Sequence, residues 1–71
     1  MESAMTATIR TLSDYSEKAR HDKATYTDYI DIQRYIADIE ESYKENIYNI
    51  DQYEILIRYA FMVKKELKKA I

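Results

Sequence analysis

The sequence predicts an all-α fold, because it contains no glycine and no proline and because its apolar residues recur at helical spacing. Hairpin turns in antiparallel sheets rely on Gly, Asn or Asp at positive φ, whereas a helical chain needs few such turns. We therefore expect a small helical hairpin or three-helix arrangement, with helices at about 4–20, 25–48 and 51–70.

The first expected helix, at about 4–20, has the weakest pattern. Its thin apolar stripe consists of Met5, Ile9, Leu12, Tyr15 and Ala19. The stretch ARHDKAT that follows has no apolar residue larger than alanine, which predicts a loop or kink near 21–25. Residues 1–24 are therefore expected to be a weakly anchored helix of a single domain, in which residues 25–71 make the main hairpin.

The second expected helix has the clearest pattern. Its apolar residues fall within an arc of roughly 80° and form a narrow seam of the coiled-coil type. This helix seam consists of Tyr29, Ile32, Ile36, Ile39, Tyr43, Ile47 and Ile50. Thr25 or Thr27 is the expected N-cap, with Asp28 in the first turn.

The third segment, NIDQYEILIRYAFMV, is so apolar that a strand, a membrane segment and a helix all have to be weighed. Asp51 followed by Glu54 resembles a capping box, and the lysines of KKELKKAI suit a helix C-terminus. Arg58 and the lysines from Lys64 onward interrupt the apolar run before it reaches the roughly 18 residues of a membrane span. The segment is therefore predicted to be a helix from about Asp51 to Ala70.

A break between the second and third helices is the preferred prediction. In one straight helix the seam and the next apolar stripe would differ by about 120°, and could not face the same neighbour. Asn49 and Asp51 are suitable turn and cap residues. Two observations favour a continuous helix instead: no Gly is present for a left-handed C-cap, and Ile57 and Phe61 would extend the seam in phase.

The third helix is apolar on more than one side. The stripe of Leu56, Ala60, Val63 and Leu67 is expected to pack within the chain, while Ile57 and Phe61 stay unassigned. A second stripe is expected to bind a partner, and it consists of Ile55, Tyr59 and Met62. A chain of 71 residues without cysteine is small and has no disulfide to support it, so we expect oligomerisation into a bundle or coiled coil.

No catalytic, cofactor-binding or metal site is predicted. His21 has neither a cysteine nor a second histidine to act with, and is expected to be exposed. Asp38, Glu41 and Glu45 share a helix face, which is better explained as solvated than as a cation site. There is no glycine for a phosphate-binding loop. The chain is therefore expected not to be an enzyme.

Charge is uneven along the chain although the net charge is −2. Residues 27–54 hold eight acids against Arg34 and Lys44, a balance of −6, and residues 55–71 have a balance of +4. The basic tail consists of Lys64, Lys65, Lys68 and Lys69. Neighbouring acidic and basic helices explain this distribution more simply than binding of nucleic acid or lipid does. The eight tyrosines are expected mainly to pack rather than to stack on bases.

These features favour a non-enzymatic protein–protein interaction module, such as a small adaptor, assembly co-chaperone, scaffold or inhibitor. Its partner would be a second copy of the chain or another protein. The alternatives are an acidic inhibitor that mimics nucleic acid, and a nucleic-acid or membrane-surface binder that uses the basic tail. The first twenty residues include an acid at position 2 and no continuous apolar core, so no secretory signal is predicted and a cytoplasmic location is expected.

Overall fold

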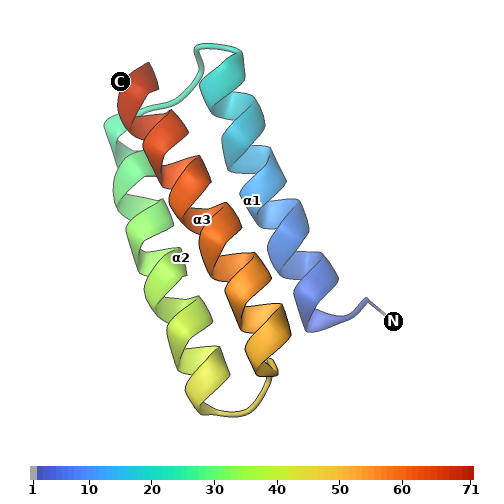
Figure 1. The fold of residues 1–71 in the computed structure, drawn as a ribbon. Coiled ribbons are helices and arrows are strands. Elements are labelled where there is room, and N and C mark those ends of the chain that lie inside the picture. Colours follow the sequence, from blue (N-terminus) through green and yellow to red (C-terminus); the bar gives the residue numbers. More distant parts are fainter. Residues whose placement is uncertain (1) are drawn as a thin grey trace.

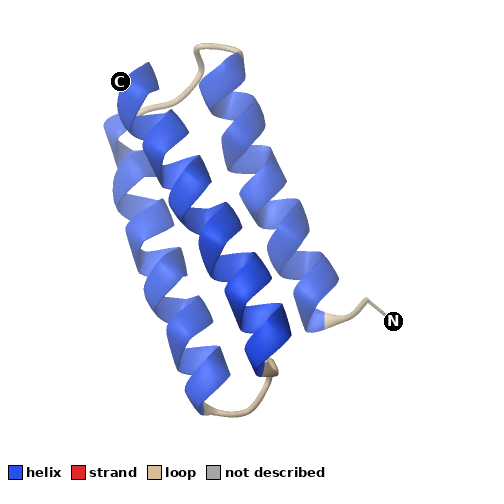
Figure 2. Ribbon diagram, viewed as in Figure 1, coloured by secondary structure: helices blue, strands red, loops and turns tan. Residues whose placement is uncertain are grey.

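The computed structural model describes residues 2–71 and contains three α-helices: α1 (Ala4–Arg20), α2 (Tyr26–Lys44) and α3 (Ile50–Ala70). None of these described residues forms a strand, so the predicted all-α class and the three-helix arrangement are confirmed (Figure 2). The chain runs up, down and up, so that α1 and α3 point the same way and α2 points the opposite way (Figure 1). α3 packs along both other helices, while α1 and α2 contact each other only weakly.

Side chains define the start of each helix. The Ser3 side chain accepts a hydrogen bond from the Thr6 N–H at the start of α1. At the start of α2, Thr25 accepts from the Asp28 N–H while the Asp28 carboxylate accepts from the Thr25 N–H, which makes a capping box. Of the two threonines considered from the sequence, Thr25 is thus the N-cap.

The capping box of α3 lies two residues before the predicted one. Asn49 accepts from the Gln52 N–H at 2.9 Å, and the Gln52 side chain accepts from the Asn49 N–H at 3.0 Å. The prediction that Asp51 and Glu54 form this cap is therefore wrong. Asparagine is as good an N-cap as aspartate, and Asp51 instead places its charge in the first turn, where the helix dipole favours it.

The predicted break between α2 and α3 is confirmed, although α2 ends at Lys44 rather than near residue 48. Asn46 adopts φ 63° and donates its N–H to Tyr43 O, and Ile47 donates to Ser42 O. This pattern is a Schellman ending in which Asn takes the left-handed position that glycine usually fills. α1 ends similarly, with Asp22 at φ 56° and a bond from the Lys23 N–H to Lys18 O.

The early end of α2 shortens the helix seam. Ile32, Ile36 and Ile39 are buried, whereas Ile47 and Ile50 are 51% and 50% exposed. The expectation that these last two residues extend the seam is wrong, because α2 ends at Lys44, so that Ile47 lies in the turn and Ile50 is the first residue of α3. Tyr48, between them, is buried instead.

The core receives side chains from all three helices, and α3 supplies its centre. Leu56, Ala60, Val63 and Leu67 have no exposed surface, so the expectation that this stripe packs within the chain is confirmed. The other buried apolar residues are Leu12, Ile32, Ile36, Ile39 and Tyr48. Among residues 2–71, no helix has the length and apolar character needed to cross a bilayer.

α1 buries the face that carries the predicted stripe, since Leu12 is buried and Met5, Tyr15 and Ala19 are partly buried against the core. Two small polar residues share this face. The buried residues of α1 are Thr8, Leu12 and Ser16, while Ile9 is 38% exposed. The two small polar residues are tolerated in the core because both are hydrogen-bonded. Thr8 Oγ1 lies 2.7 Å from the Tyr48 hydroxyl, and Ser16 donates to Glu66 at 2.9 Å.

Candidate interaction surface

The solvent side of α3 is the strongest candidate site. Ile55, Phe61 and Met62 lie on it with 56%, 50% and 53% of their surface exposed. We name this surface the outer face of α3, and its exposed residues are Ile50, Asp51, Glu54, Ile55, Arg58, Phe61, Met62, Lys65, Lys68 and Lys69.

Helical phase explains why these side chains reach solvent. At about 100° per residue, Ile55 and Met62 lie about 100° and 120° to one side of the buried Leu56, and Phe61 lies about 140° to its other side. Arg58 occupies the middle of the outer face between these apolar flanks.

Contacts on each flank identify the neighbouring helix. Tyr53 stacks on Tyr43 of α2 with ring centroids 4.3 Å apart, so Phe61 lies toward α2. Glu66 accepts from Ser16 of α1, so Ile55 and Met62 lie toward α1.

The structure places the predicted partner stripe only partly in solvent. Ile55 and Met62 are exposed, but Tyr59 is half-buried and packs against the core. Phe61, left unassigned from the sequence, is as exposed as they are, with Lys64 Nζ 5.9 Å from the centroid of its ring. The helical phase of Phe61 relative to Leu56 was the available signal for its exposure.

The lysines of the basic tail have different surroundings. Lys65, Lys68 and Lys69 are exposed, and Lys64 is half-buried beside Phe61. Glu66, the one acid among them, accepts a hydrogen bond from Ser16, which in turn accepts from Arg20 of α1 at 3.1 Å. The carboxylate thus holds α3 to α1.

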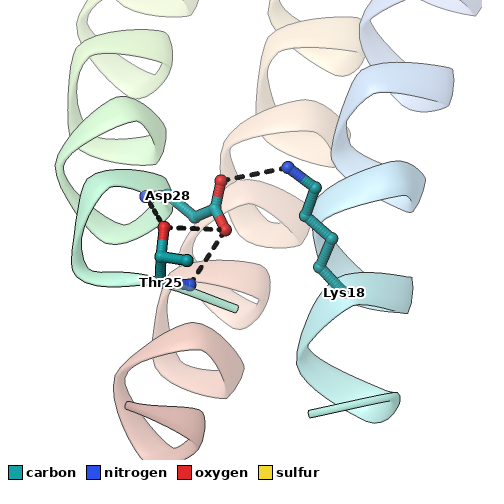
Figure 3. Close-up of polar contacts among 3 residues, drawn as sticks. All are labelled: Lys18, Thr25 and Asp28. Carbon is teal, nitrogen blue, oxygen red and sulfur yellow. Dashed lines mark hydrogen bonds and ion pairs between the residues drawn. The ribbon is translucent and has the colours of Figure 1, made fainter. Parts of the chain in front are cut away.

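An ion pair joins the last turns of α1 to the start of α2. Lys18 Nζ lies 3.1 Å from the Asp28 carboxylate, which also accepts from the Thr25 N–H and hydroxyl (Figure 3). Burial raises the pKa of Asp28, but the hydrogen bonds from Thr25 and Lys18 outweigh it and hold this pKa below its ordinary value.

Burial, together with the carboxylates of Asp31 and Asp28, raises the pKa of Tyr15 on the facing side of α1. The hollow beside it, lined by Thr11, Asp14, Tyr15 and Lys18, is open to solvent. No buried side-chain polar atom in residues 2–71 lacks a hydrogen-bond partner.

The residues weighed for catalysis or metal binding lie apart. His21 is exposed and caps the C-terminus of α1. Asp38, Glu41 and Glu45 are all exposed, and within the described part of the chain no three acidic or histidine side chains are grouped closely enough to hold a metal ion.

Comparison with family models, curated proteins and solved structures finds no significant match to this chain. The functional argument therefore rests on the residues and their geometry.

Proposed function

We propose that this protein is a non-enzymatic interaction module that binds a protein partner through the outer face of α3. The observation that carries the proposal is the exposure of Ile55, Phe61 and Met62, each by half or more, on a helix whose opposite face is fully buried. Large apolar side chains gathered on one face are typical of a binding surface, and Met and aromatic residues are common in such surfaces.

The rest of the surface supports this location. Elsewhere in residues 2–71 the exposed large hydrophobic residues are dispersed, and they are Ile9 in α1, Tyr26 at the start of α2, Ile47 in the turn after α2 and Ile71 after α3. Arg58 adds a side chain that interfaces favour over lysine, since its planar group can stack and hydrogen-bond at once. Burial of this face by a partner would remove from water the apolar area that the three helices leave uncovered.

The two alternative functions have weaker support. Acidic mimicry of nucleic acid would use Asp38, Glu40 and Glu41 on α2, but Arg34 and Lys44 flank them on either side. A nucleic-acid or lipid contact through the basic tail would have only three exposed lysines, too few for the strong phosphate binding typical of such proteins.

Site-specific photo-crosslinking tests the proposal. A photoreactive amino acid at the position of Met62 should give discrete adducts in cells that make the protein. The same group at the position of Tyr26, which is 67% exposed on α2, is the matched control and should give none. Equal labelling from the two positions, or none from either, would contradict the proposal.

Two substitutions separate loss of binding from loss of the fold. Met62→Asp should abolish the adducts formed from a photoreactive group at the position of Phe61 while far-UV helicity is kept. Leu56→Asp should unfold the chain, because it buries a charge at a position with no exposed surface. Tyr59→Ala is the less informative variant, since Tyr59 packs partly on the core.

A further inference from the structure

The exposed charges of α3 are ordered along the helix. Asp51 and Glu54 lie in its first turns, whereas Lys65, Lys68 and Lys69 lie in its last turns, and all five are exposed. The apolar residues Ile55, Phe61 and Met62 lie between the two ends. The outer face is therefore acidic at one end, apolar in the middle and basic at the other.

A surface with this order is complementary to itself when reversed. Two α3 helices laid antiparallel, and crossing between Tyr59 and Ala60, bring Asp51 level with Lys68 of the other copy and Glu54 level with Lys65. At 1.5 Å per residue these pairs lie about 13 Å and 8 Å from the crossing point, on both sides of it. A parallel pair would instead place acid beside acid and lysine beside lysine, which is unfavourable.

The side chains at the middle of this antiparallel pair are also complementary. Arg58 comes level with Phe61 of the second copy, and a guanidinium over an aromatic face is a favourable contact. The apolar flanks, with Ile55 and Met62 on one side and Phe61 on the other, then cover each other around the two arginines.

The rest of the chain does not offer a comparable surface to bind. The outward side of α2 has no exposed large hydrophobic residue after Tyr26. A contact between α3 of one copy and α2 of the next would also be heterologous, and would leave an apolar α3 uncovered at one end of an open chain. Pairing α3 with α3 closes after two copies.

We infer that the partner of the outer face of α3 is a second copy of this chain, in a two-fold dimer with antiparallel α3 helices. This inference rests on the proposed function and specifies its partner.

Charge exchange tests the dimer in sedimentation equilibrium experiments. Glu54→Lys and Lys65→Glu should each weaken dimerisation about tenfold, because each change replaces attraction by repulsion at two symmetric places. The double variant with both changes should return most of the lost affinity. Glu40→Lys, the same change on the exposed side of α2, is the matched control and should leave the dimerisation constant unchanged. Absence of recovery in the double variant would contradict the antiparallel register.

Engineered disulfides test the orientation independently, since the natural chain has no cysteine. Arg58→Cys lies close to the proposed two-fold axis and should form a disulfide-linked dimer on mild oxidation. Lys69→Cys should not, because its two copies are separated by about 28 Å along antiparallel helices, far beyond disulfide reach. Crosslinking at both positions would indicate parallel helices and overturn the inference.

The two proposals can fail separately. A purified chain that stays monomeric at millimolar concentration, together with Met62 adducts to a different protein, would overturn the dimer and keep the interaction module. A monomer that gives no such adducts would overturn both. Circular dichroism of every variant should show unchanged helicity, so that a change in mass reports association.

Discussion

Two polar side-chain links join α1 to the rest of the protein, beside the apolar packing of Leu12. Tyr48, in the loop before α3, places its hydroxyl 2.7 Å from Thr8 Oγ1 and 3.3 Å from the Ala4 carbonyl oxygen. Ser16 and Glu66 form a second link further along α1. Because partly unpaired polar groups in a core are unfavourable, these links select the register of α1 on α3 more sharply than an apolar contact does.

Removing the Tyr48 hydroxyl should show how much the stability of the fold depends on this polar link. Tyr48→Phe is expected to lower the free energy of unfolding by about 1 kcal/mol, because the buried Thr8 hydroxyl loses a partner. Thr8→Val combined with Tyr48→Phe should cost less than the sum of the two single changes, since neither partner is then left unpaired. Denaturant unfolding measures all three, with Tyr26→Phe as the exposed control. Strict additivity would show that the hydroxyls act independently.

Asp28 gives the protein an acid-sensitive connection. Its folded-state pKa lies below the ordinary value of 3.8, so the folded state holds the proton more weakly than the unfolded state does. The stabilisation is therefore complete above about pH 4 and is lost as the pH falls through the folded-state pKa.

Asp28→Asn tests this connection. The variant should be about 1 kcal/mol less stable at neutral pH, through the weakened capping box, and its stability should fall less steeply below about pH 4. Thermal unfolding from pH 2 to pH 7 makes the comparison, with the exposed Asp38→Asn as control. Identical pH profiles for Asp28→Asn and the natural chain would contradict the assigned role.

At the scale of the helix, α2 separates a buried face from a solvated one within a single turn. Ile39 is 2% exposed, whereas the adjacent Asp38 is exposed. Ile39→Ala should cost roughly 2–5 kcal/mol through the cavity it leaves, and Asp38→Ala should change stability by no more than about 0.5 kcal/mol.

The stability of an Ile47→Ala variant can be compared with that of Ile39→Ala. Ile47 was expected in the seam but is 51% exposed after the end of α2. Ile47→Ala should therefore cost much less than Ile39→Ala in denaturant unfolding. If the two cost the same, α2 would have to continue past Lys44.

At the scale of the whole molecule, α3 is the element on which the other two depend. The accessible surface of the whole chain is 4978 Å², close to the roughly 4,700 Å² expected of a monomer of 8.5 kDa. The bundle is thus compact, and what distinguishes its surface is the apolar residues gathered on the outer face of α3.

Two fragments of similar length test the central place of α3. The fragment 1–49 holds α1 and α2, which contact each other weakly, and should be unfolded in far-UV circular dichroism. The fragment 25–71 holds the α2–α3 hairpin and should keep part of its helicity, although it loses the cover that Leu12 and Ser16 give to α3. A folded 1–49 fragment would contradict this architecture.

The sequence by itself determined the helical class, the break before α3 and the inner stripe of α3. Absence of Gly and Pro, and spacing of three and four, are local properties that need no knowledge of neighbours. The same local pattern located Thr25 as one of two possible caps, because a capping side chain acts within its own first turn.

The tertiary structure alone decided that Thr8 and Ser16 of α1 lie in the core, and that Tyr59 of α3 is half-buried against the core. Thr8 and Ser16 are buried because Tyr48 and Glu66, forty and fifty residues away, satisfy their hydroxyls. Phe61 is exposed because α2 and α1 cover only the faces of α3 centred on Leu56. The burial of the Thr8 and Ser16 hydroxyls depends on contacts between distant segments, and periodicity within one helix contains no information about such contacts.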